Sequence, residues 1–303
     1  MSTEGSSTTE RTAATLPVGD SARTLSRALV ELAELEYRLG DWPAAYLSGV
    51  ASLRAAKLAG LDEEAMTALV QVALVEAGLG RADACRRHAA EAIELSRRHR
   101  SKAVEAKAHE AVGFLELGLG RIDAAIERLN RAGVVCAEHP SACSAATTWA
   151  QDLADAYVQQ GDRVGAERAV AKLEARARRS GSCVLATAVA RCRAMLATDD
   201  GCEGRFQRAL KWAARTQQPF EQARTELCFG ERLSRAGRRQ KGREFLAGAL
   251  ETFEALGSEP WAARAREALA EIDGTVHRRD GRHSRLHRAR VSFDRPHTAA
   301  QTA

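Results

Sequence analysis

Aromatic side chains are scarce in this chain of 303 residues, where they make up 5% of the sequence against 45% for all hydrophobic residues. Alanine supplies much of the apolar content, and it is both the best helix former and the smallest side chain that still packs. No stretch approaches the ~20 consecutive apolar residues that a membrane span needs. We therefore expect closely packed helices rather than sheets, and no membrane partner.

Motifs for catalysis or metal binding are also missing. The sequence has no GxxxxGK[ST] loop that could cradle phosphates and no CxxC pair. Its seven cysteines are scattered, which favours reduced thiols and a cytoplasmic location, because no signal peptide precedes them. Cys85 and Cys228 fall among small packing positions and are expected to be buried and inert. We expect no enzymatic activity, no metal and no cofactor.

The formal charge of +5 is concentrated at one end of the chain. Residues 274–303 hold seven arginines and two aspartates, so residues 1–273 are neutral. A neutral body argues against a nucleic-acid surface. We expect residues 273–303 to form a basic disordered tail, with at most weak, non-specific contact with nucleic acid. His277, His283 and His287 in that tail carry no helix signal and are not expected to bind a metal.

A period of about forty residues organises the rest of the chain. A glycine follows a leucine-rich run at successive gaps of 40, 40, 41, 40 and 36 residues. These turn glycines are Gly40, Gly80, Gly120, Gly161, Gly201 and Gly237. Seven residues before each glycine the side chain is small in all six repeats, and five and twelve residues after it in five of six. Small residues at fixed places allow two helices to cross closely.

This spacing resembles the tetratricopeptide repeat, with a longer period than the usual ~34 residues. The resemblance covers residues 21–272, after a leader (1–20) that is rich in Ser, Thr and Gly and expected to be disordered. The expected fold is therefore all-α: a tetratricopeptide-like superhelix, or α-solenoid, of about six helical hairpins plus a closing helix near 260–272.

The last repeat carries a more specific resemblance. Residues 218–272 read QPFEQARTELCFGERLSRAGRRQKGREFLAGALETFEALGSEPWAARAREALAEI. This is similar to the end of the helical-repeat region of the large ATP-binding LuxR-type transcriptional regulators, which commonly stands before their DNA-binding domain. The matching residues are Pro219, Phe220, Glu221, Ala223, Arg224, Gly230, Arg232, Leu233, Arg235, Ala236, Gly237, Arg238, Phe253, Leu256, Gly257, Pro260 and Trp261.

The resemblance implies a sensor segment without the ATPase and DNA-reading parts of that family. No phosphate-binding loop is present, and the 31 residues after Ile272 have no apolar periodicity from which a helix-turn-helix could form. We expect a truncated regulator that binds a protein partner or a small-molecule inducer and could self-associate. The alternative from another class is a free-standing adaptor that joins two proteins, and the weakest is a nucleic-acid binder that acts through its tail.

The concave surface of a solenoid is the expected binding site, because the first helix of each hairpin lines it. Counting back from the turn glycines gives the polar positions that face this groove, interleaved with apolar side chains such as Val30, Val70 and Phe114. These polar positions are Arg27, Glu34, Tyr37, Lys107, Glu110, Gln151, Asp155, Arg191, Arg224 and Glu231. Such a mixed surface could hold a peptide or a small inducer, or could be no more than a solvated inner face.

Overall fold

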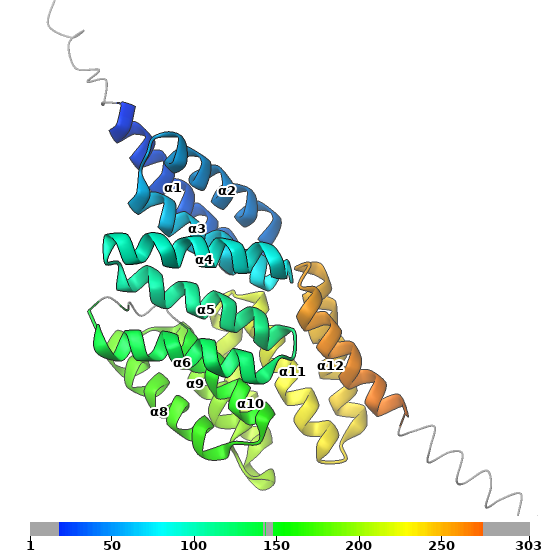
Figure 1. Cartoon of the computed structure of the whole chain (residues 1–303). Coiled ribbons are helices and arrows are strands. Elements are labelled where there is room, and N and C mark those ends of the chain that lie inside the picture. Colours follow the sequence, from blue (N-terminus) through cyan, green and yellow to red (C-terminus); the bar gives the residue numbers. More distant parts are fainter. Residues whose placement is uncertain (1–17, 142, 144–147, 275–303) are drawn as a thin grey trace, which may run out of the picture.

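The computed structural model describes residues 18–141, 143 and 148–274, and in these residues it is all helix and turn (Figure 1). Twelve named helices are followed by a thirteenth over residues 259–274. The twelve are α1 (Val18–Leu39), α2 (Trp42–Leu58), α3 (Asp62–Gly78), α4 (Ala82–His99), α5 (Lys102–Gly118), α6 (Ile122–Glu138), α7 (Trp149–Gln160), α8 (Arg163–Ser180), α9 (Cys183–Met195), α10 (Asp199–Thr216), α11 (Pro219–Arg235) and α12 (Arg239–Ala255). The predicted solenoid of six hairpins and a closing helix is confirmed.

In most hairpins a short turn with a glycine joins the two helices, as the repeat period predicts. Gly40 and Gly80 have φ angles of +92° and +75°, a left-handed conformation that glycine adopts without a steric penalty. After Gly40, the side chain of Asp41 accepts a hydrogen bond from the backbone N–H of Ala44, and Pro43 occupies the first turn of α2. This combination ends one helix and starts the next within two residues.

The prediction that Gly201 forms the turn of the fifth hairpin is wrong. Gly201 lies in the first turn of α10, and the turn itself is formed by residues 196–198. Thr198 takes the extended conformation of an N-cap residue, one of the side-chain types preferred there, so α10 begins at Asp199. Counted from the true turn residue, Ala197, the positions five and twelve residues later are Cys202 and Ala209. Both are small and buried, so the repeat pattern persists with a shorter fifth unit.

The superhelix turns back so that its last hairpin and closing helix lie beside its first three repeats (Figure 1). The Ser258 hydroxyl donates a hydrogen bond of 2.8 Å to the carbonyl of Gly78, across 180 residues of sequence. The Pro219 ring lies against Gly40, and the Pro260 ring lies against Gly80, each so close that a Cβ atom on the glycine would fall within 3 Å of it. These contacts close what would otherwise be an open solenoid.

One further expectation, on the cysteines, is wrong, and others concern residues that the structure does not describe. Cys136 and Cys143 form a disulfide with a Cα–Cα distance of 5.4 Å, so the prediction of uniformly reduced thiols is wrong. The end of α6 and the segment after it bring the two residues together, and no sequence motif predicts this disulfide. Residues 1–17 and 275–303, with His277, His283 and His287, lie outside the described residues. No described helix is long and apolar enough to cross a membrane.

Candidate functional site

A cluster of buried charged side chains lies on the axis of the superhelix, where α7, α9, α11 and the closing helix meet. Arg224 is fully buried and donates hydrogen bonds to Asp152 and, at 3.1 Å, to Asp155. Arg191 is 1% exposed and pairs with Glu221 and with the Gln151 amide oxygen. We call this set the axial cluster; its members are Gln151, Asp152, Asp155, Arg191, Glu221, Arg224, Glu231 and Arg264.

The arginines of the axial cluster offset the burial of its carboxylates to different degrees. Burial alone would raise the pKa of Asp155, but Arg264 and Arg224 lower it to about 2. For Asp152 burial outweighs Arg224, and the pKa of this carboxyl is raised. Because buried ion pairs are expensive to desolvate, such a cluster contributes more to a unique arrangement of the helices than to net stability.

Aromatic rings cover the axial cluster on the side of the first repeats. Phe220 lies within ring-centroid distances of 5.2 Å of Trp42, 5.5 Å of Phe114 and 5.4 Å of Trp261. The Trp261 ring also lies 4.7 Å from the guanidinium carbon of Arg224, a cation–π contact. Phe220, Arg224 and Trp261 belong to the motif of residues 218–272, together with Pro219 and Pro260. These motif residues therefore build the closure of the superhelix.

The closure divides the axial space into two cavities. One, of about 620 Å³, is lined by the residues that start α5, α7, α9 and α11, namely Ser101, Thr148, Ser182 and Gln218. The other, of about 750 Å³, is lined by residues at the ends of the same helices, among them Leu119, Gly161 and Leu196. We call them the N-side cavity and the C-side cavity. Both volumes lie in the range of roughly 300–1,000 Å³ that is typical of ligand sites.

Three buried polar side chains that line the N-side cavity have an atom without a hydrogen-bond partner: Glu110, Gln71 and Arg224, whose Nε has none. Glu110, on α5, is 6% exposed; its Oε1 accepts hydrogen bonds of 2.6 Å from the backbone N–H and the hydroxyl of Thr148, whereas its Oε2 has no partner. Gln71, on the neighbouring helix α3, is 9% exposed and its Nε2 has no partner. An unpaired buried polar atom costs about 1–3 kcal/mol, so this cavity holds unused capacity for hydrogen bonds.

Burial raises the pKa of Glu110 to about 7, although the hydrogen bonds from Thr148 oppose the shift. A carboxyl whose pKa is higher in the folded chain than the ordinary 4.5 stabilises the fold at low pH, and this contribution is lost as the pH rises through 7. We expect Glu110→Gln, which mimics the protonated acid, to raise the free energy of unfolding by about 3 kcal/mol at alkaline pH and by almost nothing below pH 5. Urea unfolding of both proteins at the two pH values tests this, and an equal difference at both would contradict it.

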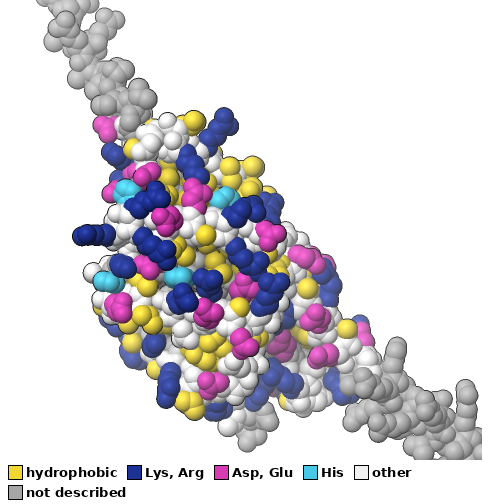
Figure 2. Space-filling model, in the orientation of Figure 1, with side chains coloured by type: hydrophobic (Ala, Val, Ile, Leu, Met, Phe, Trp, Pro, Cys, Tyr) yellow, Lys and Arg dark blue, Asp and Glu magenta, His cyan; other side chains and the backbone are white. Residues whose placement is uncertain are grey.

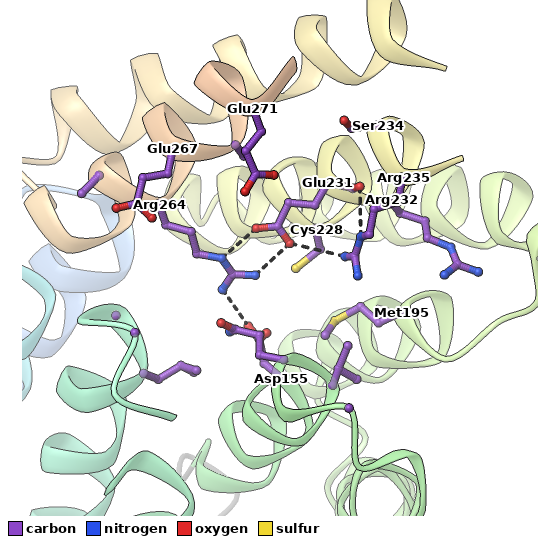
Figure 3. Close-up of a pocket in the computed structure, with 18 of the residues that line it drawn as sticks. Asp155, Met195, Cys228, Glu231, Arg232, Ser234, Arg235, Arg264, Glu267 and Glu271 are labelled. Atoms are coloured by element: carbon purple, nitrogen blue, oxygen red, sulfur yellow. Dashed lines mark hydrogen bonds and ion pairs between the residues drawn. The ribbon is translucent and has the colours of Figure 1, made fainter. Parts of the chain in front are cut away.

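The carboxylates of Asp155 and Glu231 in the C-side cavity are paired within the protein (Figure 3), although Nη1 of Arg264 has only its ion pair with Asp155 and no hydrogen bond. Arg264 donates to both carboxylate oxygens of Glu231 at 2.8 and 2.9 Å, and lies 3.7 Å from Asp155. Arg163 and Arg232 donate to the carbonyls of Leu196 and Ala197, just beyond α9. These arginines satisfy the carbonyls at the end of a helix, which is a structural role.

The ten predicted groove residues separate into four groups. Six line the N-side cavity, with Val30, Val70 and Phe114: Glu34, Tyr37, Lys107, Glu110, Gln151 and Arg224. Asp155 and Glu231 line the C-side cavity. Arg191 is buried within the axial cluster, and Arg27 has a side chain that is 64% exposed and paired with Glu64. The sequence therefore predicts the inner face of the superhelix, but not its division in two.

The sequence analysis did not identify three residues that line the N-side cavity, namely Gln71, Thr148 and Asp152. Gln71 and Asp152 occupy the same repeat position, nine residues before the turn glycine, and both are polar, so the repeat alignment contained this signal. Thr148 lies just before α7 in an irregular connection and carries no such signal. Cys85 and Cys228 are buried as predicted, and burial raises the pKa of each thiol to about 12, so neither is a ready nucleophile.

Comparisons with known proteins bear on the fold. No protein-family model matches the sequence, and no curated protein matches it. Among solved structures, the chain is similar to the Rap protein in the crystal structure of a Rap protein complexed with competence and sporulation factor. The two share 13% sequence identity with a TM-score of 0.56, over 84% of this chain and 76% of the other. At this identity the likeness supports the helical-repeat fold alone.

Proposed function

We propose that this chain is a non-enzymatic binding module that holds a short peptide in the N-side cavity. The observation that carries the proposal is two of the unpartnered buried atoms there, the Glu110 carboxylate oxygen and the Gln71 amide nitrogen. A peptide bond offers one donor and one acceptor, which is the complement that these two atoms lack. The structural likeness to a Rap protein complexed with a factor supports the same class of function.

The surroundings of the two atoms also suit a peptide. The starts of four helices line the cavity, and their partial positive charge favours a carboxylate or a carbonyl oxygen. Val70, Val104 and Phe114 supply apolar walls for side chains, and Lys107 adds a cation. In the C-side cavity, by contrast, both oxygens of Glu231 accept hydrogen bonds from Arg264, and Asp155 is paired with Arg224 and Arg264.

The binding test is a screen of a mixed library of short peptides by native mass spectrometry of the full chain. We expect a retained peptide to lose about tenfold in affinity on Glu110→Gln, equivalent to about 1.4 kcal/mol, because the amide cannot accept the ligand's N–H. The matched control is Glu267→Gln, an exposed residue that lines the C-side cavity. Absence of any retained peptide, or equal losses in both variants, would contradict the proposal.

We further propose that the module is a sensor segment related to the large LuxR-type regulators, and that its inducer binds in the N-side cavity. The support for this context is the motif in residues 218–272, which now has a physical role as the closure of the superhelix. Sequencing the native locus beyond codon 303, and translating all three frames from codon 260 onward, tests it. A helix-turn-helix in one of these frames would support the regulator, and an unrelated neighbour would favour the free-standing adaptor.

A further inference from the structure

An exposed stripe of large apolar residues runs along α1, at the start of the superhelix. Leu25, Leu32, Leu35 and Leu39 are 53%, 43%, 54% and 54% exposed, and Ala28 lies among them. Their successive spacings of three, four, three and four residues are those of the a and d positions of a heptad. Scattered exposed leucines are ordinary, but a continuous stripe along one helix face marks an interaction surface.

The same face is buried in the next repeat. The positions forty residues later on α3 are Ala65, Ala68, Val72 and Val75, which are all 3% exposed or less, and Leu79, which is half-buried. On α3 this face packs against the hairpin before it: a Cβ atom on Gly49 of α2 would lie 3.0 Å from the side chain of Val72. No hairpin precedes α1 among the described residues, and the face that this leaves uncovered is apolar.

Three of the five stripe residues on α1 are larger than their counterparts on α3, and the other two are identical. Leu25, Leu32 and Leu35 stand where α3 has Ala65, Val72 and Val75. A terminal repeat that ends in solvent requires a polar outer face. Enlargement of the apolar side chains is the opposite change, and it indicates that another surface covers this face.

The first hairpin exposes further large apolar residues on α2. Leu47, Val50 and Leu58 are 69%, 36% and 80% exposed, and hydrophobic side chains gather over this helix (Figure 2). With the four leucines of α1 they make seven exposed apolar side chains on one hairpin, more than the scattered single residues that are normal on a protein surface.

The charges of α1 do not oppose a second copy. Arg23 pairs with Asp20 and Glu64, Arg27 pairs with Glu64, and Arg38 pairs with Glu34, so the three arginines of α1 are matched by three carboxylates within the chain. The stripe is also close to symmetric about Leu32, because Leu25 and Leu39 lie seven residues to either side of it. In an antiparallel pair, Leu25 of one copy meets Leu39 of the other, Leu32 meets itself, and Ala28 lies within one residue of the point opposite Leu35. A surface that complements itself about a twofold axis is what a homodimer requires.

We propose that the stripe of α1 is a homodimer interface, in which α1 packs antiparallel against α1 of a second copy of this chain. The site is remote from the N-side cavity, because Val30, Glu34 and Tyr37, which line that cavity, lie on the opposite side of α1. The dimer therefore leaves the peptide site open, and the result of testing it does not depend on the proposed function.

Light scattering coupled to size-exclusion chromatography tests the dimer on the full chain. We expect twice the chain mass of 32.7 kDa at micromolar concentration, and the single-chain mass for the double variant Leu32→Glu, Leu35→Glu. Val134→Glu and Val164→Glu, which alter exposed valines on α6 and α8, are the matched controls and should remain dimeric. A wild-type chain that stays monomeric would overturn the proposal and leave the stripe to another chain segment or another protein.

Cross-linking tests the antiparallel geometry. In a Cys183→Ser background, which removes the exposed free cysteine, Leu32→Cys should give a disulfide-linked dimer on mild oxidation. Leu47→Cys, on an exposed part of α2 away from the centre of the stripe, should cross-link far less. Equal yields from both variants, or a dimer that survives the double glutamate substitution, would contradict the arrangement.

Discussion

Replacing Arg224 with methionine is expected to lower the free energy of unfolding by about 3–5 kcal/mol, because it leaves a buried carboxylate without its cation. Arg224 is fully buried between Asp152 and Asp155. Asp155 keeps a second partner in Arg264, but Asp152 has no other ion pair among the described residues. The apolar stem of methionine fills part of the space, so loss of the charge, rather than a cavity, dominates the effect.

Thermal unfolding followed by circular dichroism measures this effect, as a fall in the melting temperature on the order of 10 °C. Arg235→Met is the matched control, on the same helix, because its side chain is 64% exposed and a surface ion pair contributes little. Adding Asp152→Asn to Arg224→Met should restore part of the loss, since the orphaned charge is then gone. A double variant as unstable as the single one would show that packing, not charge, is responsible.

The repeat pattern predicted the architecture because it depends on local contacts. The small residues around each turn glycine are buried where the two helices of a hairpin cross; Ala45, Ala125 and Ala166 are each completely inaccessible to solvent. Helical periodicity and turn chemistry are properties of short segments, so one sequence suffices to find them. The fifth hairpin was misplaced because an Asp-Asp-Gly stretch resembles a turn but serves here as the start of α10.

The closure of the superhelix could not be predicted in this way. It joins Ser258 to Gly78 and Pro219 to Gly40, pairs of residues that no local rule connects. The sequence showed that residues 218–272 are a distinctive motif, but only the packing shows what the motif does. Phe220 and Trp261 contact each other, and Phe220 also contacts Trp42 of the first hairpin. The division of the groove into two cavities follows from this closure, and for that reason it too was missed.

The choice between the two cavities rests on which polar atoms are already paired. Counting from the turn glycines places Glu110 and Glu231 on the same inner face. In the structure Glu231 accepts two hydrogen bonds from Arg264, whereas one oxygen of Glu110 has no partner. Sequence periodicity gives the direction in which a side chain points, but its partner comes from another helix. The assignment of a ligand site therefore required the fold.

Ala125→Arg is expected to be the most damaging single change, with a loss of more than about 4 kcal/mol in the free energy of unfolding. Ala125 lies where α6 crosses α5 and has no exposed surface. The crossing is tight: a Cβ atom on Gly113 of α5 would fall within 2.5 Å of Leu129 on α6. Arginine there must either push the two helices apart or bury its charge without a partner, and both are costly.

The loss should begin in the middle of the array, because each repeat of a solenoid is stabilised mainly by its neighbours. Hydrogen exchange should then show lost protection in α5, α6 and α7, alongside a lower melting temperature. Val134→Arg places the same side chain on the same helix at a position that is 55% exposed, and should leave the melting curve almost unchanged. If Ala125→Arg also melts like the wild type, the helix crossing assigned from the repeat pattern is not what holds this part of the superhelix together.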